Sequence, residues 1–339
     1  MRTDLNDLND NLNIAVVIPS FKVARHITAV VTGIPDFVWR IYVIDDACPE
    51  GSGRVIEENI KDKRVKVVFH EQNQGVGGAV MTGYQTALLE GADIIVKIDG
   101  DGQMNTESIP LFVNPILSGE ADYTKGNRFY DLEKIRTMPP VRLFGNAVLS
   151  LMTKLSSGYW NLFDPTNGFT AIHANVCKHL PFNRISRRYF FETDMLFRLN
   201  TLRAVVVDVP MDVKYGEEIS NLKISKIIGE FWFKHARNFF KRIFYNYYLR
   251  DLSLASLELP IGFLLLIFGI IYGGYHWYRS AQFGVLTSAG TVMLTAMPIL
   301  MGIQLILAFI GYDIFSTPKK TQHNSMRFNS NNKKLNNIK

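Results

Sequence analysis

Two long stretches near the C-terminus carry no charged side chain, and they constrain this chain more than any other feature. No Asp, Glu, Lys or Arg occurs from Gly262 to Tyr278 or from Ala281 to Tyr312. A helix of about 20 apolar residues is long enough to span the hydrocarbon core of a bilayer. We therefore expect two transmembrane helices, over roughly 259–278 and 284–309, within a membrane segment of residues 256–312. The alternative is a helical hairpin buried in a large soluble core.

The charges around these stretches predict their orientation. The chain has a net charge of +6, and residues 316–339 hold six basic residues and no acidic one. By the positive-inside rule, both outer flanks then face the cytosol and the short connection faces outside. We expect an integral protein of a bacterial plasma membrane or the endoplasmic reticulum, with a polar N-terminal tail (1–12) and a basic, disordered cytosolic tail (313–339). Since the remainder is nearly neutral, nucleic acid is not an expected partner.

The segment that precedes the first apolar stretch, residues 222–252, has the pattern of amphipathic helices. Bulky apolar residues recur at helical spacing, and basic residues fill the gaps between them. A basic helix with large aromatic side chains suits a membrane interface, in contact with lipid. The alternative is a helix packed on the soluble domain.

Before residue 222, short β-branched runs alternate with stretches of helical length. The runs are Ile14–Ile18, Ile41–Ile44, Val65–Phe69 and Ile94–Ile98, and a later one is Val205–Val209. This alternation predicts an α/β domain with a parallel sheet and helices on its faces, which we place at residues 13–221. Residues 102–220 are harder to interpret, although helices are expected at Ile109–Leu117 and Val141–Leu155.

Two aspartates directly follow the fourth run, at the sheet edge where parallel sheets bind ligands. Asp99 and Asp101 are two residues apart, and two such carboxylates are able to share one divalent cation that neutralises a diphosphate. The alternative is a solvated Asp-Gly turn. An EF-hand is excluded because Met104 and Pro110 occupy positions that need Gly and Glu.

Further polar and flexible residues follow two of the other runs. Asp46 comes after the second run, where an acid bonds a ribose or a base, or else caps the next helix. The segment NQGVGGAV contains Gly75 and Gly78, which allow a ligand to approach the backbone closely. On its own this glycine pattern is a weak signal, since it lacks the spacing of a dinucleotide loop.

Taken in order, four segments resemble the family 2 glycosyltransferases: VVIPSF, VIDDACPEGSG, NQGVGGAVMTGYQTA and KIDGDGQ. The resemblance covers roughly residues 14–215 and implies a GT-A fold, a nucleotide-sugar domain with a mostly parallel sheet and flanking helices. It implies Mg²⁺ or Mn²⁺ on the donor diphosphate, held by Asp99 and Asp101 with Gln103. Lys22 stands where the family often has Glu, so a UDP-sugar and a GDP-sugar both stay open as donor.

The same resemblance supplies the donor-binding residues. They are Pro19, Ser20, Phe21, Asp46, Gly75, Gly78, Asp99, Gly100, Asp101, Lys214 and Lys223.

Later segments are similar to those of the polyprenyl-phosphate sugar transferases within this family. They are GNRF, DPTNGFTAI, YFFETDML and KYGEEISNLK, and the layout of an amphipathic helix before two C-terminal spans is also similar. The catalytic candidates are Asp101, Arg128, Asp164, Glu192 and Asp194. Arg128 would offset repulsion between phosphates, and Asp164 would orient the acceptor or act as base. The alternatives are a surface charge for Arg128, an Asx-turn for Asp164, and helix bracing for Glu192 and Asp194.

The resemblance therefore implies a membrane-anchored, inverting glycosyltransferase that moves a sugar from a nucleotide sugar to undecaprenyl or dolichyl phosphate at the cytosolic face. A transferase acting on a sugar hydroxyl is the main alternative, and it would need a general base. A processive polysaccharide synthase is disfavoured because the chain has no QxxRW motif and only two spans. A transporter is disfavoured because the spans contain no charged residue. Small residues in the second span also suit helix packing in a homo-oligomer.

Overall fold

A computed structural model describes residues 12–131, 135–136, 140–211 and 224–323, and these form two units. The first unit comprises residues up to Phe239 together with those from Pro318 onward, and the second comprises Phe240–Thr317.

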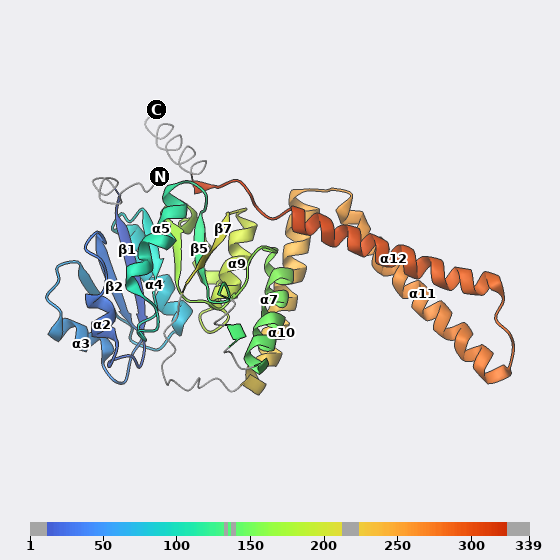
Figure 1. Ribbon diagram of the computed structural model, residues 1–339, viewed down its shortest axis with the longest axis horizontal. Coiled ribbons are helices and arrows are strands. Elements are labelled where there is room, and N and C mark those ends of the chain that lie inside the picture. Colours follow the sequence, from blue (N-terminus) through green and yellow to red (C-terminus); the bar gives the residue numbers. More distant parts are fainter. Residues whose placement is uncertain (1–11, 132–134, 137–139, 212–223, 324–339) are drawn as a thin grey trace, which may run out of the picture. The chain divides into compact units, whose positions relative to one another are not determined.

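The first unit is built on a seven-stranded sheet in the order β3-β2-β1-β4-β6-β5-β7 (Figure 1). The strands are β1 (Ile14–Ser20), β2 (Arg40–Asp45), β3 (Val65–Phe69), β4 (Ile94–Lys97), β5 (Tyr123–Asn127), β6 (Thr170–His173) and β7 (Val206–Pro210). All neighbours are parallel except β6, which is antiparallel to both β4 and β5. The mostly parallel α/β sheet and its five predicted strands are confirmed, whereas β5 and β6 were not predicted.

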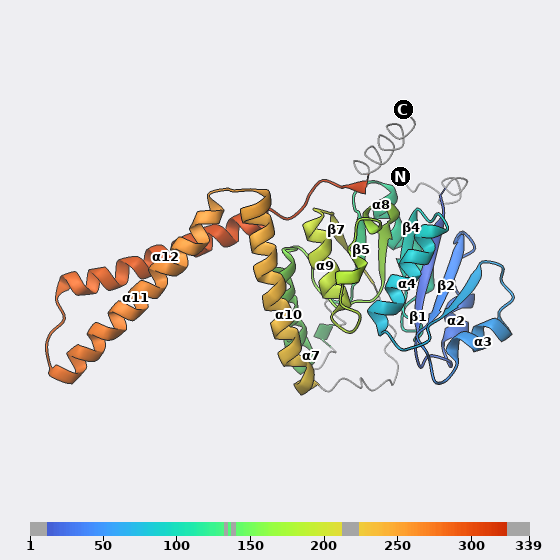
Figure 2. The same cartoon turned by 180° about the vertical axis from the view of Figure 1, so that it is seen from behind.

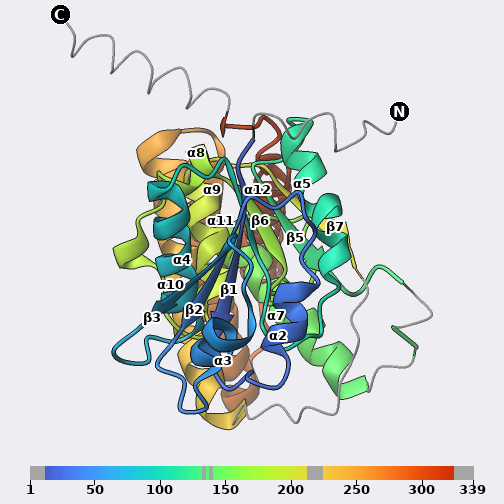
Figure 3. The same ribbon diagram turned by 90° about the vertical axis from the view of Figure 1, so that its left-hand side faces the viewer.

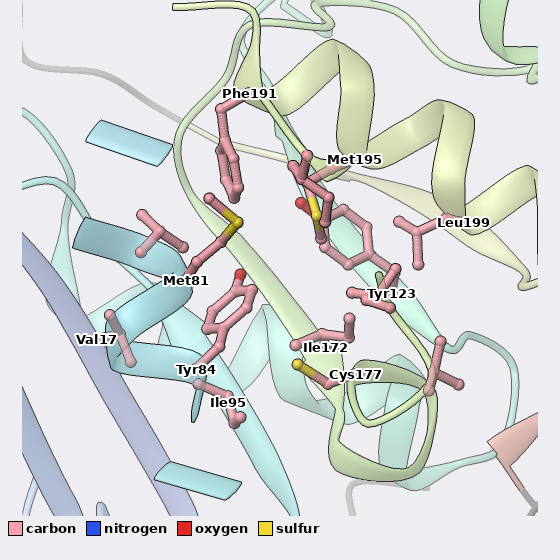
Figure 4. Packing of buried hydrophobic residues seen from close by; sticks show 14 of the residues in the cluster. Val17, Met81, Tyr84, Ile95, Tyr123, Ile172, Cys177, Phe191, Met195 and Leu199 are labelled. Atoms are coloured by element: carbon pink, nitrogen blue, oxygen red, sulfur yellow. The ribbon is translucent and has the colours of Figure 1, made fainter. Parts of the chain in front are cut away.

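Helices cover both faces of this sheet (Figures 2 and 3). They are α2 (Ile27–Thr32), α3 (Ser52–Asn59), α4 (Val76–Leu89), α5 (Ile109–Leu117), α7 (Pro140–Ser157), α8 (Ala174–Cys177) and α9 (Phe191–Thr201), with 3-10 turns at Thr106–Ser108 and Phe182–Arg184. On one face α4 and α9 pack their apolar side chains against the sheet, as Figure 4 shows for Met81, Tyr84 and Met195. On the other face, α2 and α5 bury residues such as Ile27 and Phe112. Strands β1 and β4 are nearly continuous apolar runs because both of their faces are buried, whereas β5 is buried but polar.

Helix α10 (Ile224–Phe244) begins in the first unit. There it has features of both predicted alternatives, a helix packed on the soluble domain and a helix at a membrane interface. One side packs on the domain: Asn238 donates to Asp194 (3.0 Å), and the His235 ring bonds Ser156 (2.8 Å). The other side exposes Phe233, which is 68% exposed. The helix therefore has a fixed inner face and an apolar outer face that suits lipid.

The beginning of the C-terminal tail binds the first unit, although we expected the whole tail to be disordered. The buried carboxylate of Asp122 accepts the backbone N–H groups of Gln322 and His323 (2.9 Å each) and bonds the His323 ring (2.7 Å). That ring stacks on His173, with centroids 4.5 Å apart. The chain thus returns to the first unit after the second unit ends.

The second unit consists mainly of two apolar helices, α11 (Ala255–Phe283) and α12 (Ala289–Phe315), preceded by a π-helical segment at Tyr245–Arg250. Both are long and apolar enough to cross a membrane, and only 22% and 11% of their most apolar windows are buried. That exposure disfavours the alternative of a buried core hairpin. Gly262 and Gly302 let the two backbones approach, since a Cβ on Gly302 would lie 2.7 Å from the Gly262 carbonyl oxygen. A homo-oligomer stays a prediction.

A buried ion pair closes the base of this hairpin within the second unit. Arg242 near the end of α10 makes two hydrogen bonds to Asp313 in α12 (2.5 and 3.0 Å). The Tyr247 hydroxyl donates to the same carboxylate (2.5 Å), and all three side chains are buried. Because breaking one partner would leave a buried charge, this cluster ties α12 to the end of α10.

Candidate active site

The first unit contains a cavity of about 1110 Å³ beside the C-terminal ends of β1, β2 and β4. Most of the predicted site residues line it: Pro19, Ser20, Phe21, Asp46, Gly75, Asp99, Gly100, Asp101, Arg128 and Glu192. Among the described residues, Gly78, Gln103, Asp164 and Asp194 are not part of this lining. Lys214 and Lys223 lie outside the described residues.

Asp46 holds the glycine-bearing loop against the sheet. Its two oxygens accept the backbone N–H groups of Gln74 and Gly75 (2.8 Å each), and the His70 ring bonds the same carboxylate (2.8 Å). Gly75 has φ +85°, and a Cβ there would lie 2.6 Å from the Arg187 carbonyl oxygen. Gly75 is therefore required both by its backbone conformation and by a close approach.

The neighbouring Asp45 satisfies backbone N–H groups at the start of α3, where the N-cap residue itself is Gly51. Its carboxylate accepts the N–H of Gly53 in the first turn of α3 and the N–H of Cys48, both at 2.7 Å. Asp45 is buried and lies outside the cavity lining. The two adjacent aspartates thus differ, since Asp45 organises the loop and Asp46 reaches the cavity.

Asp99 contacts a buried lysine from the strand that precedes it. The Lys97 ammonium lies 2.7 Å from an Asp99 oxygen and 3.4 Å from a Glu192 oxygen. Burial raises the pKa of the Glu192 carboxyl, and the charge of Lys97 partly opposes that rise. For Lys97 burial alone would lower the pKa, but the charges of Asp99 and Glu192 raise it above its usual range. The three groups form one charged cluster in the cavity wall.

The cavity offers oxygen ligands that fit a divalent cation. Asp99 has a 29% exposed side chain, and Asp101 lines the same wall, with its Oδ1 accepting the Gln103 N–H (3.0 Å). No group of three His, Cys, Asp or Glu side chains gathers among the described residues. Two carboxylates suit an ion that takes its remaining ligands from a diphosphate and water, as Mg²⁺ usually does.

Arg128 is clamped by Asp164. Its Nε and Nη2 donate to the two carboxylate oxygens at 2.7 and 2.6 Å, and its backbone N–H donates at 3.1 Å. Burial alone would raise the pKa of Asp164, but the hydrogen bonds and charge of Arg128 bring it below the usual value. The alternative, an Asx-turn, is not the arrangement here, since the Asp164 carboxylate accepts from Arg128 and from the Asn167 side-chain amide (3.1 Å). Asp164 is fully buried, and only Arg128 of this pair reaches the cavity.

Asp194 braces α9, which was the alternative to a place in the site. It is fully buried, and it accepts the Ser186 N–H (2.9 Å) and the Asn238 side-chain amide (3.0 Å). Glu192, two residues earlier, points to the cavity instead. The YFFETDML segment thus contributes one carboxylate to the cavity and one to the scaffold.

An apolar wall completes the cavity. It is formed by side chains from two helices: Phe144, Val148, Leu149 and Met152 of α7 with Phe231 and Trp232 of α10. The helical periodicity predicted both helices, but it did not show that they share a cavity with the two aspartates. The polar end of the cavity suits a phosphate, and this wall suits a hydrocarbon chain.

Three cations in the lining, Lys22, Lys97 and Arg188, were not among the predicted site residues. Lys97 is part of KIDGDGQ, and the available signal was a lysine inside an otherwise apolar strand. Arg188 precedes YFFETDML, and its stem lies against the Gly75 backbone, since a Cβ on Gly75 would meet Arg188 Cγ at 2.9 Å. That contact joins segments more than 100 residues apart, so no local pattern shows it.

Comparison with known families now adds to this geometry. Residues 15–180 match the sequence model of the family Glycosyl transferase family 2. This chain contains a glycosyl transferase family 2 domain. The match extends through β6 and includes the loops that carry Asp46, Asp99 and Asp101.

Several named sugar transferases are similar in sequence to this chain. UDP-N-acetylglucosamine--dolichyl-phosphate N-acetylglucosaminyltransferase of Methanococcus voltae is 28% identical over 218 residues, covering 60% of this chain and 86% of that protein. Undecaprenyl-phosphate mannosyltransferase of Micrococcus luteus is 28% identical over 224 residues, covering 65% and 90%. Polyprenol monophosphomannose synthase of Mycolicibacterium smegmatis is 25% identical, covering 62% and 80%.

Solved structures support the fold of the glycosyl transferase family 2 domain. Glucosyl-3-phosphoglycerate synthase from Mycobacterium tuberculosis in complex with UDP aligns with a TM-score of 0.52 at 18% identity, covering 70% of this chain and 82% of that chain. The same enzyme with Mn²⁺ and UDP-glucose aligns with a TM-score of 0.53, covering 70% and 81%. At this identity the likeness shows the fold alone.

Proposed function

We propose that this protein is a membrane-anchored, inverting glycosyltransferase that moves a sugar from a nucleotide sugar to a polyprenyl phosphate. The donor would bind where Asp46, Gly75, Asp99 and Asp101 line the cavity. The named relatives, which act on dolichyl, undecaprenyl and polyprenol phosphates, support this substrate class. Mg²⁺ or Mn²⁺ at Asp99 and Asp101 is part of the proposal.

The observation that carries the proposal is where the acidic side chains lie and what they bind. Asp164 and Asp194, two of our catalytic candidates, are buried and lie outside the cavity lining. The described carboxylates in the lining are Asp46, which holds a loop, Glu192 and Asp99, which share Lys97, and Asp101, the second proposed metal ligand. A sugar hydroxyl needs a base to accept its proton, whereas a phosphate is already ionised at neutral pH. The arrangement therefore favours a phosphate acceptor.

In the proposed reaction, an acceptor phosphate oxygen attacks the anomeric carbon as the bond to the donor diphosphate breaks. The configuration inverts, and a nucleoside diphosphate leaves. A bound cation would offset the developing charge on this leaving group. Arg128, oriented by Asp164, and Arg188 present guanidinium groups that would hold the acceptor phosphate near the donor. The apolar wall of α7 and α10 would take the first part of its hydrocarbon chain.

The membrane arrangement follows from chain connectivity. The first unit precedes the apolar hairpin, and the segment after the hairpin returns to the first unit at Asp122. If α11 and α12 both cross the bilayer, both of their outer ends lie on the side of the catalytic domain. The basic tail supports the cytosolic side, by the positive-inside rule.

The test uses the purified full chain in detergent with undecaprenyl phosphate, Mn²⁺ and a panel of labelled nucleotide sugars. We expect label in the organic phase with one donor, and a loss of at least about a thousandfold in Asp101→Asn, because the cation loses a charged ligand. Asp36→Asn, at an exposed carboxylate outside the cavity lining, is the matched control and keeps its activity.

Two outcomes would contradict the proposal in different ways. Sugar transfer only to a lipid-linked glycan, with none to undecaprenyl or dolichyl phosphate, would favour the hydroxyl acceptor. Full activity in EDTA, or in Asp101→Asn, would remove the metal from the proposal.

A further inference from the structure

Lys97 occupies an unusual position for a lysine. It lies in β4, between β1 and β6, and its side chain is 1% exposed. The strand around it is otherwise apolar. Burial of an ammonium at this place, next to the proposed metal site, is unfavourable unless the charge is paired. A buried charge of this kind is normally paired, and both of its described partners are carboxylates in the cavity wall.

The surrounding backbone leaves room for this arrangement. Gly168, of the DPTNGFTAI segment, faces the pair so closely that a Cβ there would lie 2.6 Å from Lys97 Nζ and would collide with an Asp99 oxygen. Gly168 has an ordinary backbone conformation, so space rather than φ requires glycine here. The Lys97–Asp99 contact is thus built from two separate segments of the sequence.

We propose that Lys97 is a positioning residue whose ammonium is shared between Asp99 and Glu192 and competes with the divalent cation for Asp99. In the structure the ammonium is closer to Asp99 (2.7 Å) than to Glu192 (3.4 Å). When a cation binds Asp99, Glu192 retains the ammonium and so lowers the cost of releasing the aspartate. The inference rests on the proposed function only in taking Asp99 as a metal ligand.

This arrangement predicts effects of opposite sign on metal affinity. Lys97→Met removes the competing charge, so Mn²⁺ alone should bind about fivefold or more tightly. Glu192→Gln removes the second acceptor and leaves the ammonium on Asp99, so Mn²⁺ should bind about fivefold or more weakly. Glu192→Gln should change the Mn²⁺ affinity less in the Lys97→Met background than in the wild type, because Glu192 acts on the cation through Lys97.

The experiment titrates the full-length protein in detergent with Mn²⁺, without nucleotide, and follows free Mn²⁺ by electron paramagnetic resonance and bound Mn²⁺ by water-proton relaxation. Lys125→Met is the matched control, since Lys125 is also a buried lysine paired with an aspartate but lies outside the cavity lining. Its Mn²⁺ affinity should equal that of the wild type. Thermal melts show whether each variant is folded, and Lys97→Gln replaces Lys97→Met if the latter does not fold.

If the effects of the two changes on Mn²⁺ affinity are additive, the proposal of a shared ammonium is wrong. Additivity would mean that Lys97 and Glu192 each act on the cation independently. An unchanged Mn²⁺ affinity in both single variants would overturn it as well. Neither result depends on sugar transfer, so failure of this inference is distinguishable from failure of the proposed function, which would show as absent transfer with the metal effects intact.

Discussion

Strands β1 to β4 and strands β5 to β7 form two halves of one sheet, and different interactions hold them. β1 and β4 are buried along their whole length and are apolar except for Ser20 and Lys97. In the other half, the buried ammonium of Lys125 in β5 binds Asp208 in β7 (2.8 Å), and Asn127 donates to the same carboxylate (3.0 Å). The first half carries the proposed donor side of the cavity, and Arg128 directly follows β5 of the second.

The difference is that a charge pair joins two neighbouring strands, β5 and β7, in the half that carries the proposed acceptor side. The Lys97–Asp99 pair of the first half instead lies within β4 and the loop that follows it. A buried ion pair contributes little net stability, but it imposes one geometry and is costly to break. Arg128 leaves the end of β5 directly after Asn127, and its clamp by Asp164 lies beside the Lys125–Asp208 pair. The paired charges thus determine where the guanidinium points.

The largest expected effect tests the ion pair itself. Lys125→Met should destabilise the protein by about 3 kcal/mol, because it leaves Asp208 buried without its ammonium. The measurement is chemical denaturation of the full chain in detergent. Lys125→Met/Asp208→Asn should recover much of that loss, since it removes both charges of the pair while the amide oxygen is still able to accept the Phe163 N–H. Equal destabilisation in the single and double variants would mean that packing, and not charge, holds this half.

The next effect separates the two sides of the cavity. Asp164→Asn keeps the side-chain shape but loses the charge that orients Arg128, so kcat/KM for polyprenyl phosphate should fall about a hundredfold. Binding of the nucleoside diphosphate, measured by calorimetry, should stay the same. Arg54→Ala, at an exposed cation in α3, serves as control for a changed surface charge. An equal loss in donor binding would contradict the assignment of Arg128 to the acceptor.

The smallest effect concerns the tail segment that binds beside β5. His323→Ala should lower the free energy of unfolding by about 1 kcal/mol at pH 7. The reason is that Asp122 loses one hydrogen bond and the His173 ring loses its stacking partner. Burial would raise the pKa of Asp122, but its bonds to His323, Val205 and Gln322 bring it below the usual value.

The sign of the pH dependence follows from that depressed pKa. The stability that Asp122 contributes is complete above its unfolded pKa of about 3.9, and it is lost as the pH falls through the lower folded pKa. Thermal melts between pH 7 and pH 2.5 check this, and Asp122→Asn should be less stable at pH 7 and show a shallower acid decline. An identical acid limb in both proteins would rule out this contribution.

Patterns along the sequence were sufficient where a residue's neighbours in the chain decide its structure. Apolar runs predicted β1, β2, β3, β4 and β7, and the signal is clearest in β1 and β4, which are buried on both faces. The charge-free stretches predicted α11 and α12, because a helix that spans a bilayer must also be apolar. The Asp-Gly-Asp pattern predicted part of the wall of the cavity. The buried Lys125 and Asn127 concealed β5, since a polar strand is credible only when its partners are known.

The sequence by itself determined the sheet, the apolar hairpin and the presence of two aspartates at a strand end, since each depends on local composition and periodicity. Only the tertiary structure decided which acids reach the cavity. Asp164 and Asp194 are buried outside its lining, and Glu192 contacts Lys97, which lies 95 residues earlier in the sequence. Pairing between distant charges depends on the packed backbone that brings them together, so residue type alone does not reveal it.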